Sequence, residues 1–408
     1  MPGPDLSQGQ TADSSLVKAG MVPWLIPVLG LLTMFGPMAI DMYLPGLPAI
    51  GRDFGADQAT VQLTLSWFLV AFGFGQLAWG PLGDRYGRKA PAAAGILLFV
   101  GGSVGCALAG SVVGLAGWRF VQGLGAGAAP VLARAMVRDS FDKDRAASTM
   151  SLMMLVMGIA PMLAPLAGGQ VLAHSGWRTI FWVLAGFGLV ALAGLATLRE
   201  TLHPSRRVMG GGVQALRSYL ALARDRRFLG YVLSSGFVFA GMFAYIAGTP
   251  YVYIEYFGVP PQQYGFLFGL NVVGMMLVNT VNSRLVLRLG TDPLMRAGTA
   301  VAASMGCVLL AAGASGVGGL WGIVVPLVGY LGMTGLVGAN GMAGALARVP
   351  ERAGAASALA GTLQLGLGAG TGWLVGHFAD GTPVPMCAII AACGLLALCI
   401  NLTLVRRA

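Results

Sequence analysis

Long apolar runs recur along the whole chain, separated by short polar gaps. A helix of roughly 20 apolar residues is long enough to cross the hydrocarbon core of a membrane. Only 10% of the residues are charged, whereas about 25% is typical of soluble domains. The sequence therefore predicts an all-α membrane protein. Its twelve expected transmembrane helices cover residues 22–46, 60–82, 90–112, 114–133, 147–173, 179–198, 228–252, 263–282, 296–315, 319–345, 354–378 and 384–405.

The basic residues lie almost entirely in alternate gaps between these runs. If the N-terminus is cytoplasmic, 22 of the 25 Lys and Arg residues lie on the cytoplasmic side, and only Arg52 and Arg178 lie in external loops. This bias obeys the positive-inside rule only when the number of helices is even. We expect a multi-pass protein of the bacterial inner membrane with both termini cytoplasmic. The net charge of +10 then reports topology, and no nucleic-acid partner is expected.

The chain is expected to divide near its middle. The longest hydrophilic stretch, 199–227, contains seven arginines and separates two halves of six helices each, 21–198 and 228–408. The short segments DRAAS and ERAGAAS, about half a chain apart, precede the fifth and the eleventh helix. We expect two pseudo-symmetric halves related by an axis along the membrane normal, with a cytoplasmic linker between them. Residues 1–20 are expected to form a disordered cytoplasmic tail.

The residues needed for covalent or metal chemistry are not visible in the sequence. The five cysteines lie inside apolar runs without the spacing of metal ligands. There is no phosphate-binding GxxxxGKS/T loop and no nucleophile with a matching base. We expect a protein that is not an enzyme, that holds no metal or cofactor and that uses the proton gradient as its energy source. A membrane-embedded enzyme or a sensor is the rival from a different class.

Two charged residues fall inside the apolar runs, Asp41 in the first helix and Arg119 in the fourth. An unpaired charge costs at least about 2.5 kcal/mol near the bilayer centre. The helix rise places both residues in the outer half of the membrane, on helices that could face each other. Either both side chains reach the outer interface, or they form a proton-sensitive pair that lines a central cavity. The pair is chemically reasonable because desolvation and a nearby guanidinium act on a carboxyl group in opposite directions.

Uncharged polar side chains also occur within the runs. They are candidates for substrate contacts, although such residues more often form hydrogen bonds between helices. Gln122 lies one turn after Arg119 on the same helix face. The candidate substrate-binding residues are Tyr43, Gln122, Tyr245, Asn271, Asn340 and Gln364.

The loop between the second and third predicted helices carries the segment GPLGDRYGRK at 80–89. This segment resembles the signature loop of the major facilitator superfamily. The resemblance implies that Asp84 faces the start of the eleventh helix, where a helix N-terminus favours an anion. It also implies an inner gate that stabilises the outward-facing state. The residues of this gate are Gly83, Asp84, Arg85, Gly87 and Arg88.

Two further motifs are similar to those of proton-coupled exporters in the same superfamily. WRFVQGLGAG at 118–127 resembles their helix-four motif, which assigns Arg119 to proton coupling. GIAPMLAPLAGG at 158–169 resembles the helix-five motif of antiporters, usually written GPxxGG, with Ala164 in place of the first glycine. Each proline in it removes a backbone hydrogen bond and bends the helix. The antiporter-motif residues are Gly158, Pro161, Pro165, Gly168 and Gly169.

The segments AIDMYLPGLPAIGRDFG at 39–55 and ANG at 339–341 resemble the bicyclomycin-resistance and chloramphenicol-efflux (Bcr/CflA) branch of drug:proton antiporters. This resemblance implies alternating-access export of small amphipathic or lipophilic drugs, with Asp41 as the proton site and Arg119 as its modulator. The alternative is a proton-coupled importer or exporter of a metabolite or sugar within the same superfamily. The expected partners are the drug, protons and lipid. A monomer is expected because one chain contains both halves.

Overall fold

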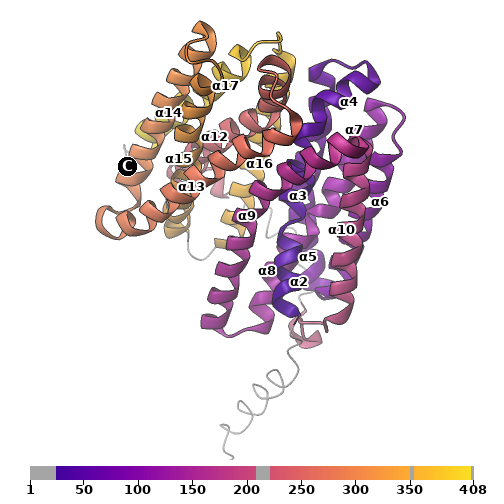
Figure 1. The fold of residues 1–408 in the computed structure, drawn as a ribbon. Helices are drawn as coiled ribbons and strands as arrows, with labels where there is room; N and C mark the ends of the chain where they lie inside the picture. Colours follow the sequence, from indigo (N-terminus) through magenta and orange to yellow (C-terminus); the bar gives the residue numbers. More distant parts are fainter. Residues whose placement is uncertain (1–23, 208–220, 350–352, 406–408) are drawn as a thin grey trace, which may run out of the picture.

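The computed structural model describes residues 24–207, 221–349 and 353–405, and every regular element in these ranges is a helix (Figure 1). The elements before residue 200 form the N-terminal half. They are α2 (Leu25–Thr33), α3 (Phe35–Asp41), η1 (Leu44–Gly46), α4 (Leu47–Phe54), α5 (Gln58–Tyr86), α6 (Lys89–Ala107), α7 (Val112–Ala126), α8 (Ala128–Ser140), α9 (Lys143–Ser175) and α10 (Trp177–Thr197).

A short turn, η2 (Pro204–Arg206), follows the N-terminal half. The remaining elements form the C-terminal half. They are α12 (Arg226–Pro250), η3 (Tyr251–Tyr256), α13 (Pro261–Leu289), α14 (Thr291–Ser315), α15 (Gly319–Arg348), α16 (Ala353–His377), α17 (Val384–Ile400) and η5 (Asn401–Val405). Within the described residues, eleven helices are long and apolar enough to cross a membrane, and α16 lies among them as a further long helix.

The predicted all-α membrane fold is confirmed, but several helices extend beyond their predicted ends. The first spans Leu25–Phe54 rather than ending at residue 46. Pro45 and Pro48 each stand in the first turn of a new segment, η1 and α4, where a missing N–H breaks no hydrogen bond. The fourth and eighth helices continue to Ser140 and Leu289 instead of 133 and 282, because arginines interrupt the apolar run there while the backbone stays helical. The predicted tail at 1–20 and much of the linker lie outside the described residues, so the boundaries of the halves stay predictions.

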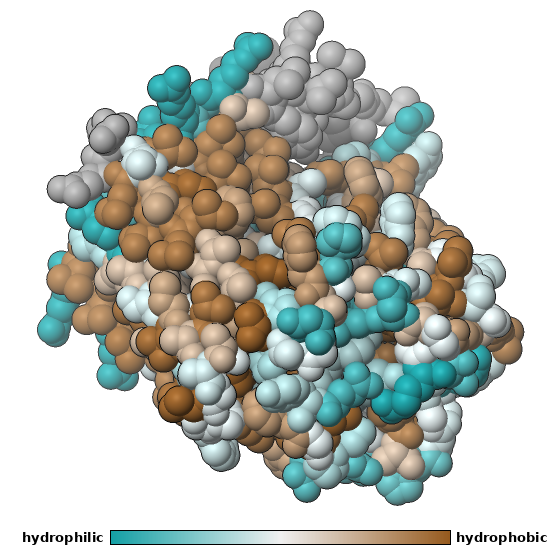
Figure 2. All heavy atoms as spheres, turned by 90° about the horizontal axis from the view of Figure 1, so that it is seen from above, coloured by the Kyte–Doolittle hydropathy of each residue, from teal (hydrophilic) through white to brown (hydrophobic). Residues whose placement is uncertain are grey.

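The two halves meet mainly through two helix pairs, α5 with α16 and α9 with α13. Arg52 Nη1 donates to Glu255 Oε1 over 2.9 Å, and Gln62 Nε2 donates to the carbonyl oxygen of Ala247 over 3.0 Å. We call the end of the bundle that carries Arg52, Gln62 and Glu255 the closed end. Figure 2 looks onto this end and shows a face filled with side chains, many of them hydrophilic.

The opposite end, which carries the loop around Asp84 to Lys89, is called the basic end. α9 and α13 still touch where Gly158 approaches the side chain of Met276. Nearer to the basic end, the α9 side chains of Leu152 and Met154 are exposed. In Figure 1 the helices α8 and α9 continue past the crossing with α13 and diverge from the C-terminal half. The halves are therefore joined at the closed end and separate towards the basic end.

Candidate functional site

Asp41 lies where the first transmembrane helix is interrupted. α3 ends at Asp41, and two turn residues and η1 follow before α4 begins. The side chain is 5% exposed and makes no hydrogen bond within the described part of the chain. Buried carboxyl groups normally have hydrogen-bond partners. One without a partner, at a break in a membrane helix, is a candidate functional group.

Arg119 lies fully buried on α7. Its Nη1 donates to the carbonyl oxygen of Ala39 over 3.0 Å and to Gln122 Oε1 over 2.6 Å. Its guanidinium carbon is 4.2 Å from the ring centre of Phe68 and 4.5 Å from that of Tyr43. Aromatic faces attract a buried cation in this geometry. The Nε and Nη2 atoms of Arg119 have no hydrogen-bond partner within the described chain, so two nitrogens of the guanidinium can still donate hydrogen bonds.

Asp41 and Arg119 do not form the expected ion pair in this conformation. Among the described residues, neither of them takes part in a salt bridge. Arg119 instead binds the backbone of Ala39, two residues before Asp41. Residues two apart on a helix do not share a face, so the carboxyl group is directed elsewhere. The prediction of a direct attraction is therefore wrong for this state, and the two residues are linked through the backbone of α3.

A polar cluster of the C-terminal half lies near Asp41. Asn271 Nδ2 donates to the Tyr245 hydroxyl over 3.0 Å, and Thr249 Oγ1 lies 3.0 Å from the Tyr264 hydroxyl. Both tyrosines are buried, and both are close enough to the Asp41 carboxyl to interact with it electrostatically. The turn that follows Asp41 also packs against the C-terminal half, where η1 contacts α12. Tyr264 was missed in the sequence, since its hydrogen-bond partner Thr249 lies on a different helix.

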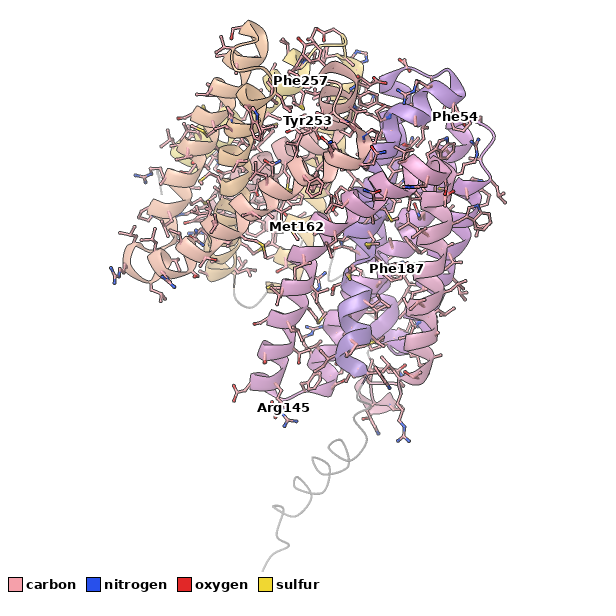
Figure 3. The ribbon with its side chains drawn as sticks, viewed as in Figure 1. Phe54, Arg145, Met162, Phe187, Tyr253 and Phe257 are labelled. Atoms are coloured by element: carbon pink, nitrogen blue, oxygen red, sulfur yellow. The ribbon has the colours of Figure 1, made fainter. Side chains whose placement is uncertain are left out.

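The antiporter-motif segment of α9 is enclosed between the two halves. A methyl group at Gly168 would overlap the carbonyl oxygen of Met42, the residue after Asp41, and one at Gly169 would overlap the carbonyl oxygen of Pro261 in α13. At Gly158 the same methyl group would make an ordinary contact of 3.5 Å with the Met276 side chain. Pro161 and Pro165 both lie inside α9. Figure 3 places Met162 at the centre of this crossing.

The other predicted substrate contacts do not share one site. The Tyr43 hydroxyl lies 2.7 Å from Thr64 Oγ1, and the Gln122 amide donates to Ser103 Oγ over 2.8 Å. Asn340 donates to Asn282 Oδ1 over 2.8 Å, nearer to the basic end than the tyrosine cluster. Gln364 is partly exposed on α16. The structure therefore groups Tyr43 and Gln122 with Arg119, groups Tyr245 and Asn271 near Asp41, and separates Asn340 from both groups.

The predicted inner gate is organised around Arg88. Its Nη1 donates to Asp84 Oδ1 over 2.6 Å and its Nε donates to Asp139 Oδ2 over 2.7 Å. Burial lowers the pKa of Arg88, but the hydrogen bonds to Asp139 and Asp84 outweigh it and hold the pKa above its ordinary value. Arg85 stacks on its neighbour Tyr86. The start of α16 lies partly outside the described residues, so the predicted approach of Asp84 to it stays a prediction.

Glu200, which lies outside the GPLGDRYGRK motif, caps the gate loop from the end of the N-terminal half. Its carboxylate accepts the backbone N–H groups of Arg88 and Lys89 over 2.8 and 3.1 Å. At Gly87, where φ is +96°, a methyl group would come within 2.6 Å of Glu200 Oε2. Burial raises the pKa of Glu200, but the backbone donors outweigh it and hold the pKa below its ordinary value.

Glu200→Gln is expected to lower thermal stability near pH 7 by no more than about 1 kcal/mol, because the carboxylate is exposed and its hydrogen bonds are screened by solvent. A lowered folded-state pKa contributes stability that is present above the ordinary carboxyl pKa and is lost as the pH falls through the folded value. The difference from wild type should therefore shrink as the pH falls below about 4.3. Thermal unfolding in detergent measures it, with Asp144→Asn, an exposed acid on the same end, as the control. Equal stability of wild type and Glu200→Gln at pH 7 contradicts the capping role.

A family model described as Major Facilitator Superfamily matches residues 29–372, which is most of the chain. The chain belongs to the major facilitator superfamily. The relatives and structural neighbours of this superfamily member are transporters, and the chain is a transporter rather than an enzyme.

Curated relatives agree with the resemblance to the Bcr/CflA branch. A bicyclomycin resistance protein homolog of Haemophilus influenzae is 33% identical over 373 residues, 91% of this chain and 94% of the relative. The transporter YdgK of Bacillus subtilis is 38% identical over 89% of this chain and 90% of its own length. Multidrug resistance protein MdtL of Escherichia coli is 30% identical over 90% of this chain and 92% of its own.

Solved structures show the same fold at low sequence identity. A D-xylose-proton symporter has a TM-score of 0.73 at 17% identity, covering 94% of this chain and 97% of its own. The nucleoside transporter NupG has a TM-score of 0.75 at 12% identity, covering 94% and 99%. These similarities support the arrangement of two bundles of helices around a common interface.

Proposed function

We propose that this transporter exports small amphipathic or lipophilic drugs across the bacterial inner membrane in exchange for protons. The observation that carries the proposal is the position of Asp41, a buried carboxyl without a partner at the interface of the two halves. Relatives along nearly the whole chain are named for resistance to bicyclomycin and to multiple drugs. No cofactor is required because the proton gradient supplies the energy, and a single chain contains both halves.

The positive-inside rule assigns the basic end to the cytoplasm, so the closed end faces outwards. In this orientation the conformation is closed to the outside, and its halves separate towards the cytoplasm. Both termini are then cytoplasmic. Among the described residues, the ion pairs of Arg88 with Asp84 and Asp139 lie within the N-terminal half. Alternating access then consists of rocking the halves about the α5–α16 and α9–α13 contacts.

Protonation of Asp41 is the step that links drug and proton. An antiporter is driven by the gradient only if proton and drug compete for the carrier, because coupling between two ligands is reciprocal. Asp41 satisfies this requirement if its ionised form holds the drug-loaded state and its neutral form permits the return. Arg119 modulates the protonation of Asp41, since it holds the backbone of α3 next to Asp41 and keeps two nitrogens free to bind the carboxylate in another state.

Purified protein in liposomes tests this function. With an imposed pH gradient, acidic on the side of the closed end, bicyclomycin, chloramphenicol and ethidium should move from the side of the basic end towards the acidic side. Their uptake should release protons that a pH-sensitive dye records. Movement of these drugs in the same direction as protons indicates a symporter, and failure to move any of them while a sugar or metabolite is carried favours the alternative function.

A further inference from the structure

The two tyrosines near Asp41 differ in the hydrogen bonds that their hydroxyl groups still have available. The Tyr245 hydroxyl oxygen accepts the amide N–H of Asn271. Its own proton has no acceptor among the described residues, so Tyr245 can donate a hydrogen bond. A hydroxyl group has one proton and two acceptor positions, so accepting from Asn271 leaves the Tyr245 proton free to be donated.

The Tyr264 hydroxyl has the opposite hydrogen-bonding capacity. Thr249 Oγ1 donates its proton to the carbonyl oxygen of Tyr245 over 2.9 Å. In the 3.0 Å contact between the hydroxyls of Thr249 and Tyr264, Tyr264 must therefore be the donor. With its proton used in this way, the Tyr264 hydroxyl can only accept a further hydrogen bond.

Helix packing places the residue after Asp41 and the residue after Tyr264 against the same turn of α9. Gly168 of α9 touches the backbone of Met42, next to Asp41, and Gly265 of α13, next to Tyr264, would place a methyl group 2.6 Å from the backbone nitrogen of Leu166. One turn of α9 is thus enclosed between the residues that follow Asp41 and Tyr264. η1 also packs on α12, the helix of Tyr245.

Few other ionisable groups can act on Asp41 from the surrounding helices. α7 contributes Arg119, whose guanidinium is directed at the Ala39 carbonyl. The turn after α3 contributes Tyr43, which is bound to Thr64. The segment of α9 from 158 to 172 has no acidic or basic residue. Tyr245 on α12 and Tyr264 on α13 are the hydroxyl groups that the C-terminal half presents to it.

We propose that Tyr245 and Tyr264 are positioning residues of the proton site and not drug contacts. Tyr245 donates a hydrogen bond to the ionised carboxylate of Asp41, and Tyr264 accepts one from its protonated form. The C-terminal half thereby distinguishes the two protonation states through two hydroxyls of opposite polarity. This inference rests on the proposed function, because it gives Asp41 the role of the proton carrier.

Infrared titration of the purified protein tests the inference without any transport. The carboxyl band that is absent from Asp41→Asn reports the protonation of Asp41. Tyr245→Phe removes a donor to the charged form, so the pH of half-protonation should rise by about half a unit or more. Tyr264→Phe removes an acceptor for the neutral form, so this pH should fall by a similar amount. Tyr251→Phe is the matched control, since its hydroxyl is also buried without a hydrogen-bond partner among the described residues but lies beyond α12 on η3; it should leave the titration unchanged.

Shifts of opposite sign for the two variants support the inference. Shifts of the same sign, or no shift in either, overturn it, as does an unchanged titration with a raised KM for the drug. If Tyr245→Phe does not fold, Asn271→Leu frees the Tyr245 hydroxyl from its orienting donor and should move the titration in the same direction. If the wild type moves no drug against protons, the proposed function fails, while the infrared result still decides whether the tyrosines position Asp41.

Discussion

Asp41→Asn is expected to reduce proton-driven accumulation of drug by more than about tenfold, which corresponds to at least about 1.4 kcal/mol of coupling free energy. Among the described residues, Asp41 is the one carboxyl group that lies away from the ends of the membrane-spanning helices. An amide of the same size cannot exchange a proton, so the drug loses its competitor. The halves can still rock, and exchange of labelled for unlabelled drug without a gradient should persist.

This expected result is measured in liposomes with the same protein-to-lipid ratio for each variant. Asp380→Asn is the control, because Asp380 is an exposed acid at the closed end whose contacts to Thr382 an amide oxygen can preserve. It should accumulate drug as the wild type does. Undiminished gradient-driven accumulation by Asp41→Asn contradicts the assignment, and loss of exchange as well as accumulation indicates that Asp41 binds the drug rather than the proton alone.

The fold was predictable because membrane helices leave strong, local signals. Twenty apolar residues in a row, bounded by arginines, predict a span whatever its neighbours are. The ends were less predictable, because arginines interrupt the apolar run near the end of helices such as α13 while the helix continues. The restart of the first helix at Pro45 and Pro48 depends on where the missing N–H groups fall in a turn, which hydropathy alone does not reveal.

The site was only partly predictable. Charge inside an apolar run singled out Asp41 and Arg119, since lipid makes such residues rare. Whether these two residues form an ion pair depends on which face of α3 is turned towards Arg119. Arg119 binds the backbone of Ala39, two residues before Asp41, so the expected pair does not form. Tyr264 and Glu200 contribute through hydrogen bonds to partners distant in the sequence. No pattern within one helix encodes such partners.

The glycines of the α9 motif provide the second large effect, because they differ in what surrounds them. Gly169→Ala is expected to reduce transport by more than about tenfold, because its methyl group meets the backbone of Pro261 and backbone cannot yield as a side chain can. This contact joins α9 of one half to the first residue of α13 in the other. Gly158→Ala, in the same motif, meets only the flexible end of Met276 and should transport nearly as the wild type does.

The cause of the loss can be separated from misfolding by measuring the conformation. Ser66 is buried at the interface, where its hydroxyl donates to the carbonyl oxygen of Ala369 over 3.3 Å. In a background without the native cysteines, Ser66→Cys should react slowly with an impermeant maleimide, and faster when combined with Gly169→Ala, since the halves then separate at the closed end. Normal transport and unchanged labelling of the Gly169→Ala variant contradict a role for this contact in closure. The glycines of this motif are then of two kinds. Gly169 admits no side chain and controls the rocking of the halves, whereas Gly158 accepts a methyl group and does not.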